Sequence, residues 1–432
     1  MLELLHLQNV GPAPEMEMQL APRLNLITGD NGLGKSFLLD VAWWALTRTW
    51  ARHMALPYAP PAEAKISYRY GSRSGSRVKY ESLFDRETER WSIKAARPAI
   101  PGLVMYAQVD GGFSVWDPAR NYWRKEAPDR PSAYLFAAHE VWDGNAHCEG
   151  LIRDWASWQR EGSITFQQLQ RVLSALSPSE REKLEPGELR KISLDDPKRY
   201  PTLRMRYGQD VPVVHASSGM RRAIALAYLL VWTWQEHVAA CELRGQAPTR
   251  EIIFLIDEIE AHLHPQWQRR IIPALLDVMV SLTETHDVKV QMVAATHSPL
   301  ILASAEPTFD AEKDAWFDLD VLEEEETVAL QQRTFVRRGD VSHWLTSEAF
   351  DLKEARSLEA ENAITQALAL VRQPAPSTVE IERVDGLLRA SLGDIDRFWV
   401  RWSAFRDETL ARAAPAPKLR ERATKKERKV RA

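Results

Sequence analysis

The chain has 432 residues, which predicts two to three domains at about 150 residues per domain. Hydrophobic residues make up 45% of it and charged residues 27%, which matches ordinary globular proteins and excludes wholesale disorder. A formal net charge of -4, from 56 basic and 60 acidic residues, excludes a strongly basic nucleic-acid binder, taken globally. The two cysteines, Cys148 and Cys241, exclude a disulfide scaffold and favour a reducing compartment.

Neither an export signal nor a membrane span is expected. Residues 1–10 lack the basic region and the long apolar region of a signal peptide. No run approaches the roughly 18 uncharged apolar residues of a transmembrane helix. We therefore expect a cytoplasmic protein that makes no contact with membranes.

In chain order, the first half predicts strands and then helices. Apolar segments indicate strands over 2–7 and 23–28, with a helix over 37–49. Alternating segments within 51–100 suggest a small antiparallel sheet, and a further strand is expected over 104–109. Residues 133–206 look mostly helical, with breaks at 177–179 and 186–187.

The second half alternates helix and strand. We expect a buried helix over 219–240, a strand over 252–256, a helix over 267–282 and a strand over 288–295. Apolar strands separated by helices indicate a mostly parallel sheet that is covered on both faces. Beyond it come short mixed segments over 306–350, helices over 352–372 and 378–406, and a charged tail from Ala414.

A phosphate-binding loop stands between the second strand and the first helix. Its candidate phosphate ligands are Gly29, Asn31, Gly32, Gly34, Lys35 and Ser36. The glycines let backbone N–H groups close around phosphates, and the helix that follows points its positive end at the same anions. Lys35 would reach the β- and γ-phosphates, and Ser36 would ligate Mg²⁺. The pattern therefore predicts ATP and Mg²⁺ as cofactors.

An acidic pair ends the apolar strand over 252–256. Asp257 at the end of this strand can hold Mg²⁺, directly or through water. Glu258, beside it, would activate the attacking water as a general base. Together with the phosphate loop, in this order, the pair favours nucleotide hydrolysis.

These motifs resemble those of the ATP-binding cassette (ABC) class of ATPases. Ser217 and Gly219 fall on the characteristic Ser and Gly of the cassette signature, whereas Ala216, Ser218 and Met220 depart from it. In this class the signature Ser meets the γ-phosphate held by a partner subunit, so the resemblance implies an ATP-sandwiched homodimer or a higher oligomer. The alternative is a simple Ser cap on a buried helix.

The resemblance assigns two more residues. His297 follows the strand over 288–295 and is similar to the cassette's switch histidine, which touches the γ-phosphate. Gln108 looks like the Q-loop glutamine, which senses Mg²⁺ and the attacking water. His262 and His264 could form a metal pair, but no third ligand is close in sequence, so we do not favour a metal there.

The segment Glu260–Pro265, the signature Ser217–Arg222 and the segment Thr296–Pro299 together resemble those of DNA-repair and defence ATPases, which are related to SMC proteins and to OLD-family nucleases. The resemblance covers about residues 1–305, with 51–210 matched only by position. The chain is more similar to the stand-alone ATPases of bacterial anti-phage systems, of the Septu and retron types, than to the OLD-family nucleases. Those are encoded beside a separate effector, often an HNH nuclease. The resemblance therefore implies a sensor of invader or DNA state that regulates a nuclease partner.

We accordingly expect an α/β fold of the P-loop, ABC-ATPase type, with a mixed β-sheet, an inserted helical region and a C-terminal helical module. The expected parts are a split ATPase core over 1–132 and 207–305, the insertion over 133–206, a mixed then helical module over 306–413 and a basic flexible tail over 414–432.

Other functions stay open at this point. One is a nucleotide-gated DNA-binding or repair scaffold with little turnover. The other is an OLD-like nuclease using Asp318 and Asp320, which we interpret instead as ordinary surface acids. Nucleic acid is a possible partner through the tail, whose net charge is +6, or through the Arg- and aromatic-rich segment 397–406. A solvated tail and a helix packing its apolar face are the respective alternatives.

Overall fold

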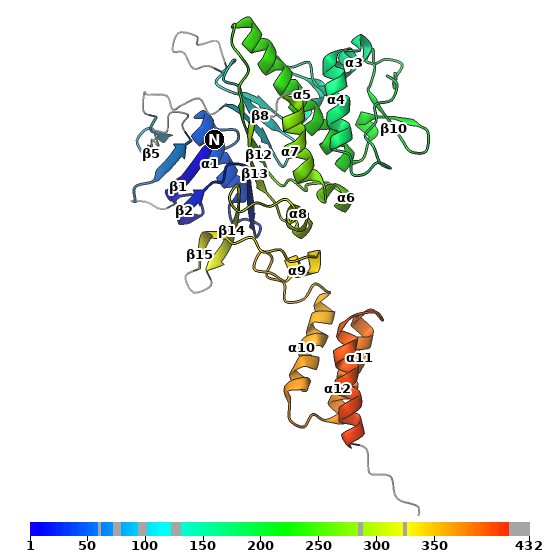
Figure 1. Ribbon diagram of the computed structural model, residues 1–432. Helices are drawn as coiled ribbons and strands as arrows, with labels where there is room; N and C mark the ends of the chain where they lie inside the picture. The colour runs from blue at the N-terminus through cyan, green and yellow to red at the C-terminus, as the bar shows by residue number, and fades with distance from the viewer. Residues whose placement is uncertain are drawn as a thin grey trace, which may run out of the picture. The chain divides into compact units, whose positions relative to one another are not determined.

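A computed structural model describes residues 1–58, 62–71, 79–93, 102–121, 131–283, 288–322 and 326–413 (Figure 1). The chain divides into two compact units, Met1–Phe350 and Asp351–Ala432, and each is described by itself below. The basic tail over 414–432 lies outside the described residues, so its contact with nucleic acid stays a prediction.

The first unit contains an eight-stranded sheet in the order β15-β14-β3-β13-β12-β7-β8-β9. The five strands from β14 to β7 are mutually parallel, and the strands at both edges are antiparallel. This confirms the expected α/β class with a mixed sheet. The strand bounds are β3 Leu24–Gly29, β7 Leu103–Ala107, β8 Phe113–Trp116, β9 Tyr134–Phe136, β12 Glu251–Ile256, β13 Lys289–Ala295, β14 Asp314–Leu322 and β15 Thr327–Arg333.

A second, antiparallel sheet has the order β2-β1-β4-β5-β6. Helix α1 (Lys35–Thr47) packs between the two sheets, and its Trp43 and Trp44 are fully buried in an apolar cluster fed by both. Burying such large rings supplies much of the stabilisation on this face. The strand bounds are β1 Leu2–Val10, β2 Ala13–Gln19, β4 Lys65–Tyr70, β5 Lys79–Asp85 and β6 Arg90–Trp91.

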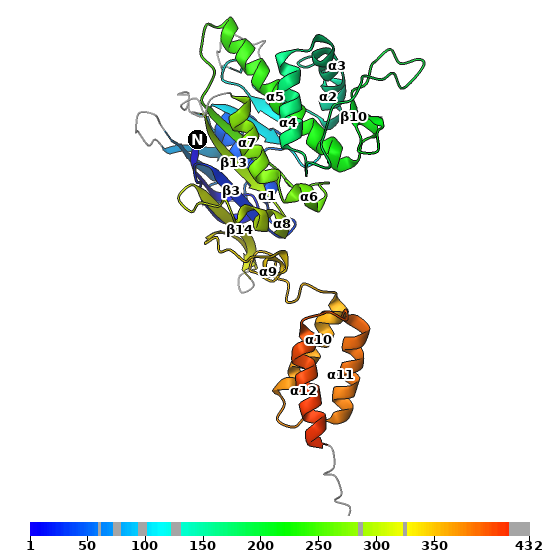
Figure 2. The same cartoon turned by 45° about the vertical axis from the view of Figure 1, so that its right-hand side comes forward.

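Helices cover the opposite face of the large sheet (Figure 2). The 26-residue helix α5 is apolar along most of its length and is buried at the centre of this layer. The helix bounds are α2 Ala138–Asp143, α3 Leu151–Glu161, α4 Ile164–Ala175, α5 Ser218–Leu243, α6 Pro265–Gln268, α7 Ile271–Leu282, α8 Pro299–Ala305 and α9 Val341–Leu345, with the 3-10 turn η1 Val213–His215. The helix expected over 267–282 is thus two helices that meet at Arg269–Arg270.

The inserted region is helical only in its first part. After α4 the chain runs to α5 through irregular backbone and the hairpin of β10 (Thr202–Arg204) and β11 (Asp210–Pro212). Prolines explain the difference, because each lacks a backbone N–H and disfavours a helix around it. They are Pro178, Pro186, Pro197 and Pro201.

Residues 306–350 were expected in a C-terminal module, but they lie in the first unit. Strand β14 pairs with β3 in parallel, and its first six residues are buried. Because this strand contains acidic residues, its sequence did not indicate that it is buried. Asp314 accepts hydrogen bonds from Arg23, and Asp318 accepts one from Thr28 Oγ1 at 2.7 Å. The interpretation of Asp318 as a surface acid is therefore wrong.

The second unit is a group of three helices, α10 (Leu358–Arg372), α11 (Thr378–Ser391) and α12 (Phe398–Ala413). The helix expected over 378–406 is broken at 392–397, where Gly393 stands. Trp402 is completely buried in the small apolar core, with Phe398 and Phe405 packed against that core. The aromatic residues of segment 397–406 thus form a packing face of a helix.

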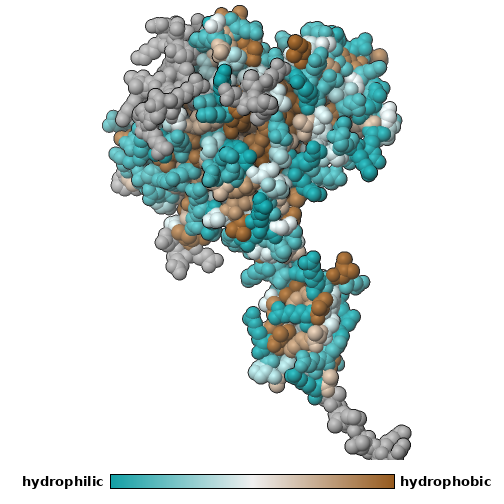
Figure 3. Space-filling model, in the orientation of Figure 1, coloured by the Kyte–Doolittle hydropathy of each residue, from teal (hydrophilic) through white to brown (hydrophobic). Residues whose placement is uncertain are grey.

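No helix among the described residues is both long and apolar enough to cross a membrane. On the face drawn in Figure 3, hydrophilic residues cover most of the first unit, and hydrophobic ones show in smaller patches.

A buried acid in the inserted region makes the stability of the fold depend on pH. Burial raises the pKa of Asp154 to about 6, although Tyr228 donates a hydrogen bond to its carboxylate at 2.7 Å. A raised folded-state pKa contributes stability that is complete below the unfolded value near 4 and is lost as pH rises through about 6.

We predict that Asp154→Asn removes this loss, because its amide oxygen still accepts from Tyr228 and carries no charge. The melting temperature of the variant minus that of the wild type should be more positive, by a few degrees, at pH 7.5 than at pH 5. Asp195→Asn, at an exposed position, is the matched control. A difference that does not change with pH would contradict the prediction.

Candidate functional site

The phosphate loop joins β3 to α1 through three glycines with positive φ, at 129° for Gly29, 84° for Gly32 and 107° for Gly34. A Cβ on Gly29 would lie 2.3 Å from the carbonyl oxygen of Leu319 in β14, and one on Gly34 would lie 2.8 Å from Pro12 Cγ. Around Gly32 the space is open. Gly29 and Gly34 are thus required by both conformation and space, whereas Gly32 is favoured by conformation alone.

Lys35 begins helix α1 and folds back over the loop. Its Nζ donates to the backbone oxygens of Gly29 at 2.6 Å and Asp30 at 2.7 Å. Burial lowers the pKa of Lys35, although Glu258 and other acids nearby oppose that effect. Asn31 and Gly32 are exposed at the tip of the loop. An incoming phosphate would therefore find the ammonium already held at the loop.

Ser36 and Asp257 meet across the ends of α1 and β12. The Ser36 hydroxyl donates to Asp257 Oδ1 at 2.9 Å. Asp257 is completely buried, and its Oδ2 has no hydrogen-bond partner among the described residues. A hydroxyl beside a buried carboxylate is the hard oxygen pair that Mg²⁺ prefers. These two residues therefore fit the expected magnesium ion.

Glu258 and His297 face each other at the same edge of the sheet. Glu258 adopts a left-handed backbone with φ of 45°, and its Oε1 lies 3.9 Å from His297 Nε2. Burial, aided by the nearby Lys35 ammonium, lowers the pKa of His297, which is therefore neutral at pH 7. A neutral ring can donate one hydrogen bond without adding charge.

Glu260 holds this histidine in place. It accepts hydrogen bonds from Thr296 Oγ1 at 2.7 Å and from the backbone N–H of His297. Sequence reasoning named Glu260 only as the first residue of the segment Glu260–Pro265 after the acidic pair and gave it no role in the site. Its spacing of two residues from Glu258 is the signal that could have found it.

Gln108 follows β7, and its side chain is almost entirely buried. Its Nε2 donates to Ser114 Oγ at 2.9 Å, and its backbone oxygen accepts from Arg222 Nη1 at 2.7 Å. In this conformation the amide is engaged by β8. Contact of Gln108 with a metal or with water therefore stays a prediction.

Ser217 and Gly219 open helix α5. Ser217 is exposed, and its hydroxyl accepts from the backbone N–H of Met220 at 3.4 Å, which is the geometry of an ordinary helix cap. A Cβ on Gly219 would lie 2.7 Å from the backbone oxygen of His262. The structure thus joins the signature to the segment after the acidic pair, and it does not place Ser217 in the cluster of Lys35 and Asp257.

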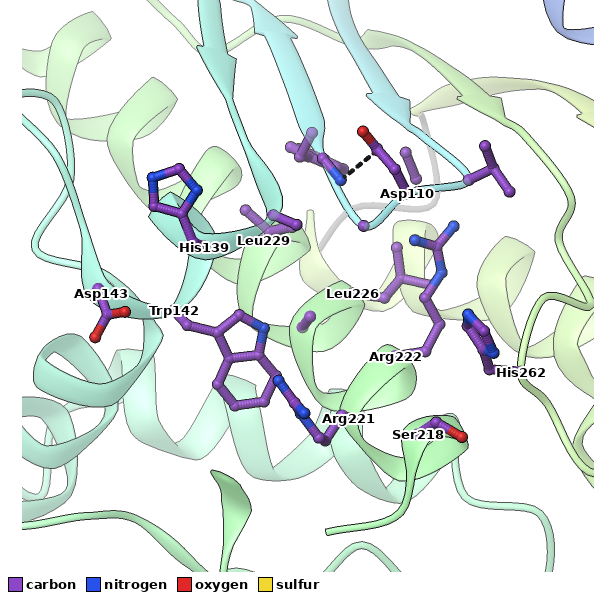
Figure 4. Close-up of a pocket in the computed structure, with 17 residues that line it drawn as sticks. Asp110, His139, Trp142, Asp143, Ser218, Arg221, Arg222, Leu226, Leu229 and His262 are labelled. Atoms are coloured by element: carbon purple, nitrogen blue, oxygen red, sulfur yellow. Dashed lines mark hydrogen bonds between the residues drawn. The ribbon is translucent and has the colours of Figure 1, made fainter. Parts of the chain in front are cut away.

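A pocket of about 470 Å³ lies between the Gln108 loop, α2 and the start of α5 (Figure 4). Arg222 and His262 line one part of it, and Trp142 lines another, with the Arg221 guanidinium 4.8 Å from the Trp142 ring. The pocket therefore adjoins the start of α5, where Ser218 lines it, whereas neither Lys35 nor His297 is among its lining residues.

Arg52 was not found by sequence reasoning. Its Nε donates to Asp40 Oδ1 at 3.0 Å, its Nη2 donates to the Tyr106 hydroxyl at 2.7 Å, and its Nη1 lies 3.3 Å from Asp257 Oδ2. It stands in a segment rich in Pro, Ser and Arg, where no pattern marks one arginine over another. Among the described residues, no group of three or more His, Cys, Asp or Glu could hold a metal, the region of His262 and His264 included.

Residues 24–303 match the family described as "AAA domain, putative AbiEii toxin, Type IV TA system", and the chain belongs to this family. Together with the mixed sheet and the loop that precedes α1, this defines an ATPase domain of the ABC and AAA type.

The chain is similar to a curated relative, the Septu protein PtuA of Bacillus mycoides (strain KBAB4). The two are 28% identical over 173 residues, which is 40% of this chain and 21% of the relative. The match thus spans only about a fifth of the relative's length.

Among solved structures, the chain is similar to the SMC head domain from Thermotoga maritima, with a TM-score of 0.39 and 14% identity over 77% of this chain and 99% of that one. It is also similar to the Smc head domain with an extended coiled coil derived from Pyrococcus furiosus, bound to the C-terminal domain of ScpA. That TM-score is 0.42 with 14% identity, over 77% of this chain and 96% of that one.

Two of the three loop glycines, Gly29 and Gly32, provide a matched test of the phosphate loop. We predict that Gly29→Ala lowers the melting temperature strongly and abolishes ATP binding, because its Cβ would collide with the backbone of Leu319. Gly32→Ala should cost only on the order of 1 kcal/mol of stability, because it meets conformational strain alone. Thermal melts and binding of a fluorescent ATP analogue measure both. Equal effects in the two variants would show that β14 does not constrain the loop.

Proposed function

We propose that the chain binds ATP with Mg²⁺ at this edge of the large sheet and hydrolyses it to ADP and phosphate. The observation that carries the proposal is the convergence of three groups of residues at the carboxyl ends of β3, β12 and β13. The loop with Lys35 offers phosphate donors, Ser36 with Asp257 offers oxygen ligands, and Glu258 faces His297. In parallel sheets, the carboxyl ends of the strands are where ligands bind.

Each residue has a defined task in this reaction. Lys35 and the N–H groups of the loop hold the phosphates. Ser36 and Asp257 would hold Mg²⁺, which when bound would supply positive charge beside the phosphate oxygens. The Glu258 carboxylate orients the attacking water and accepts its proton. The neutral His297 ring, fixed by Glu260, donates a hydrogen bond to the γ-phosphate.

The proposal extends to a homodimer. Ser217 and Gly219 lie at the N-terminal, positive end of the 26-residue helix α5, where backbone N–H groups attract anions. Ser217 is exposed there, and Gly219 is buried. Because Ser217 does not join the cluster of its own chain, the γ-phosphate that it serves would belong to a second copy. Each copy would then complete the site of the other.

The expected role in anti-phage defence, as an ATPase that senses invader or DNA state and regulates an HNH-type effector nuclease, belongs to the same proposal. The toxin named in the family description and the similarity to a Septu protein support it. The discriminating experiment is co-expression with a nuclease encoded beside the gene, comparing phage plating for wild type and Lys35→Ala. Equal protection against phage by the wild type and by Lys35→Ala would show that defence does not require ATP binding at this site.

We predict that Glu258→Gln lowers phosphate release by about 10²- to 10⁴-fold while ATP binding persists, because the amide keeps the shape of the side chain but cannot accept a proton. Steady-state phosphate release and nucleotide binding measure the two effects. The surface variant Glu182→Gln is the matched control and should behave as wild type. Unchanged turnover would remove Glu258 from the mechanism. A wild type that binds ATP without measurable turnover would favour the nucleotide-gated scaffold instead.

We predict further that Glu258→Gln accumulates as an ATP-bound dimer, because hydrolysis no longer releases the partner. Light scattering after size exclusion, with and without ATP and Mg²⁺, measures the mass. Adding Ser217→Arg should restore the monomer, since the larger cation blocks the helix end. Leu243→Arg, at the exposed far end of α5, is the control that should leave the dimer intact. A dimer that survives Ser217→Arg would contradict the sandwich.

A further inference from the structure

Arg52 touches both residues of the proposed magnesium site, through the Asp257 carboxylate and the backbone oxygen of Ser36. Only 21% of its side chain is exposed, although it carries a full charge. Its three nitrogens engage three different side chains: Asp40 on α1, Tyr106 on β7 and Asp257 after β12. Its Nη2 also lies 3.3 Å from the backbone oxygen of Ser36. One guanidinium therefore joins α1, β7 and the end of β12.

The cluster has a simple charge balance. Arg52 contributes one positive charge, and Asp40 and Asp257 contribute one negative charge each. Tyr106 donates to Asp40 Oδ1 at 3.1 Å and stays neutral, because burial and the adjacent carboxylate raise its pKa far above its usual range. Counted over these groups alone, the cluster holds one uncompensated negative charge, shared between two carboxylates that compete for the same guanidinium. Lys35 and Arg222 act on Asp257 from outside this cluster.

Asp257 makes the weaker of the two carboxylate contacts with the Arg52 guanidinium. The contacts of the guanidinium with Asp40 and Tyr106 are directed hydrogen bonds, whereas Asp257 Oδ2 has charge contact at 3.3 Å but no hydrogen bond among the described residues. This leaves Asp257 fixed in direction by Ser36 yet incompletely neutralised. A carboxylate in that state is prepared to attract a divalent cation without being locked to the arginine.

We propose that Arg52 is a positioning residue that sets the Mg²⁺ affinity of the site, with Asp40 controlling how much of its charge reaches Asp257. The inference rests on the proposed function, because it concerns the same metal ligands. A permanent cation beside Asp257 opposes a second cation at that carboxylate, and the planar fork keeps the carboxylate aligned with Ser36. Asp40 holds the guanidinium back, so that the opposition is partial.

Substitutions of Arg52 and of Asp40 should therefore change the affinity for divalent ions in opposite directions. Removing the charge with Arg52→Gln leaves two unpaired carboxylates and should tighten divalent-ion binding, while loss of alignment lowers turnover. Removing the competing acid with Asp40→Asn lets Arg52 pair fully with Asp257 and should weaken divalent-ion binding. The double variant restores the original net charge and should return close to the wild-type affinity.

A purely structural role predicts something else. Arg52 also lies 5.6 Å from the Tyr106 ring centroid and could serve packing alone. In that case all variants would lower the melting temperature, and metal affinity would fall in each of them or stay unchanged. Shifts of opposite sign in the metal affinity of Arg52→Gln and Asp40→Asn therefore distinguish the proposed role of Arg52 from a purely structural one.

The test uses the full chain with a non-hydrolysable ATP analogue at pH 8 and titrates Mn²⁺, reading the free ion by electron paramagnetic resonance. We expect about tenfold tighter binding for Arg52→Gln and about tenfold weaker binding for Asp40→Asn, each corresponding to about 1.4 kcal/mol. Arg52→Lys keeps the charge and should stay within about threefold of wild type, since it changes only the hydrogen-bond geometry. Melts in the chelator EDTA check that each variant is folded.

Shifts of the same sign in Arg52→Gln and Asp40→Asn, or no shift in either, would overturn the inference while leaving the proposed ATPase intact. If Arg52→Gln does not fold, weaker binding by Asp40→Asn is still required, and unchanged binding there would overturn the inference. A wild type that binds no Mn²⁺ together with the nucleotide analogue would instead reject the proposed function itself.

Discussion

The backbone of Gly29 lies so close to the carbonyl of Leu319 that no side chain fits between them, and the geometry of the phosphate loop depends on this approach. Strand β14 pairs along the whole of β3, so it fixes where β3 ends and where the loop begins. From the other side, Ser36 on α1 bonds Asp257 after β12 and ties the loop to the acidic pair. The loop is thus held between two strands that are far apart in sequence, and its backbone donors are organised before any phosphate arrives.

Charge is the second constraint on the site. Lys35, Asp257, Glu260 and His297 are all at least half buried, and burial shifts the pKa of Lys35, Glu260 and His297 toward the neutral form. These groups stay correctly oriented because each acid or base is held by a specific hydrogen-bond donor or acceptor or by an ion pair. Glu260 aligns His297, Ser36 aligns Asp257, and Arg52 bridges Asp40 and Asp257. The arrangement shows how a site can concentrate opposite charges without collapsing into fixed ion pairs.

The sequence was most informative where local rules decide the structure. The phosphate loop, the apolar strand before Asp257 and the buried helix after Ser217 each carry a pattern that a few residues define, and the structure has them in the expected order. The failures have long-range causes. Strand β14 was missed because Asp314 and Asp318 are satisfied by Arg23 and Thr28, partners about 290 residues away. The roles of Glu260 and Arg52 were missed because they lie in contacts with residues distant in sequence, Thr296 for Glu260 and Asp257 for Arg52. The helical content of the inserted region was overestimated because Pro178 and Pro186 were treated as local breaks, whereas Pro197 and Pro201 were not considered.

The position of β14 has a consequence for how this ATPase can be divided. The family match ends at residue 303, before β14 begins at Asp314. A fragment cut at that point would leave β3 as an open edge, with its backbone donors and acceptors unpaired and the first glycine of the loop unsupported. Such an edge would invite pairing between chains, and the fragment would aggregate rather than turn over nucleotide. The smallest unit that keeps the phosphate loop supported is therefore longer than the region that matches the family, and it ends only after β14.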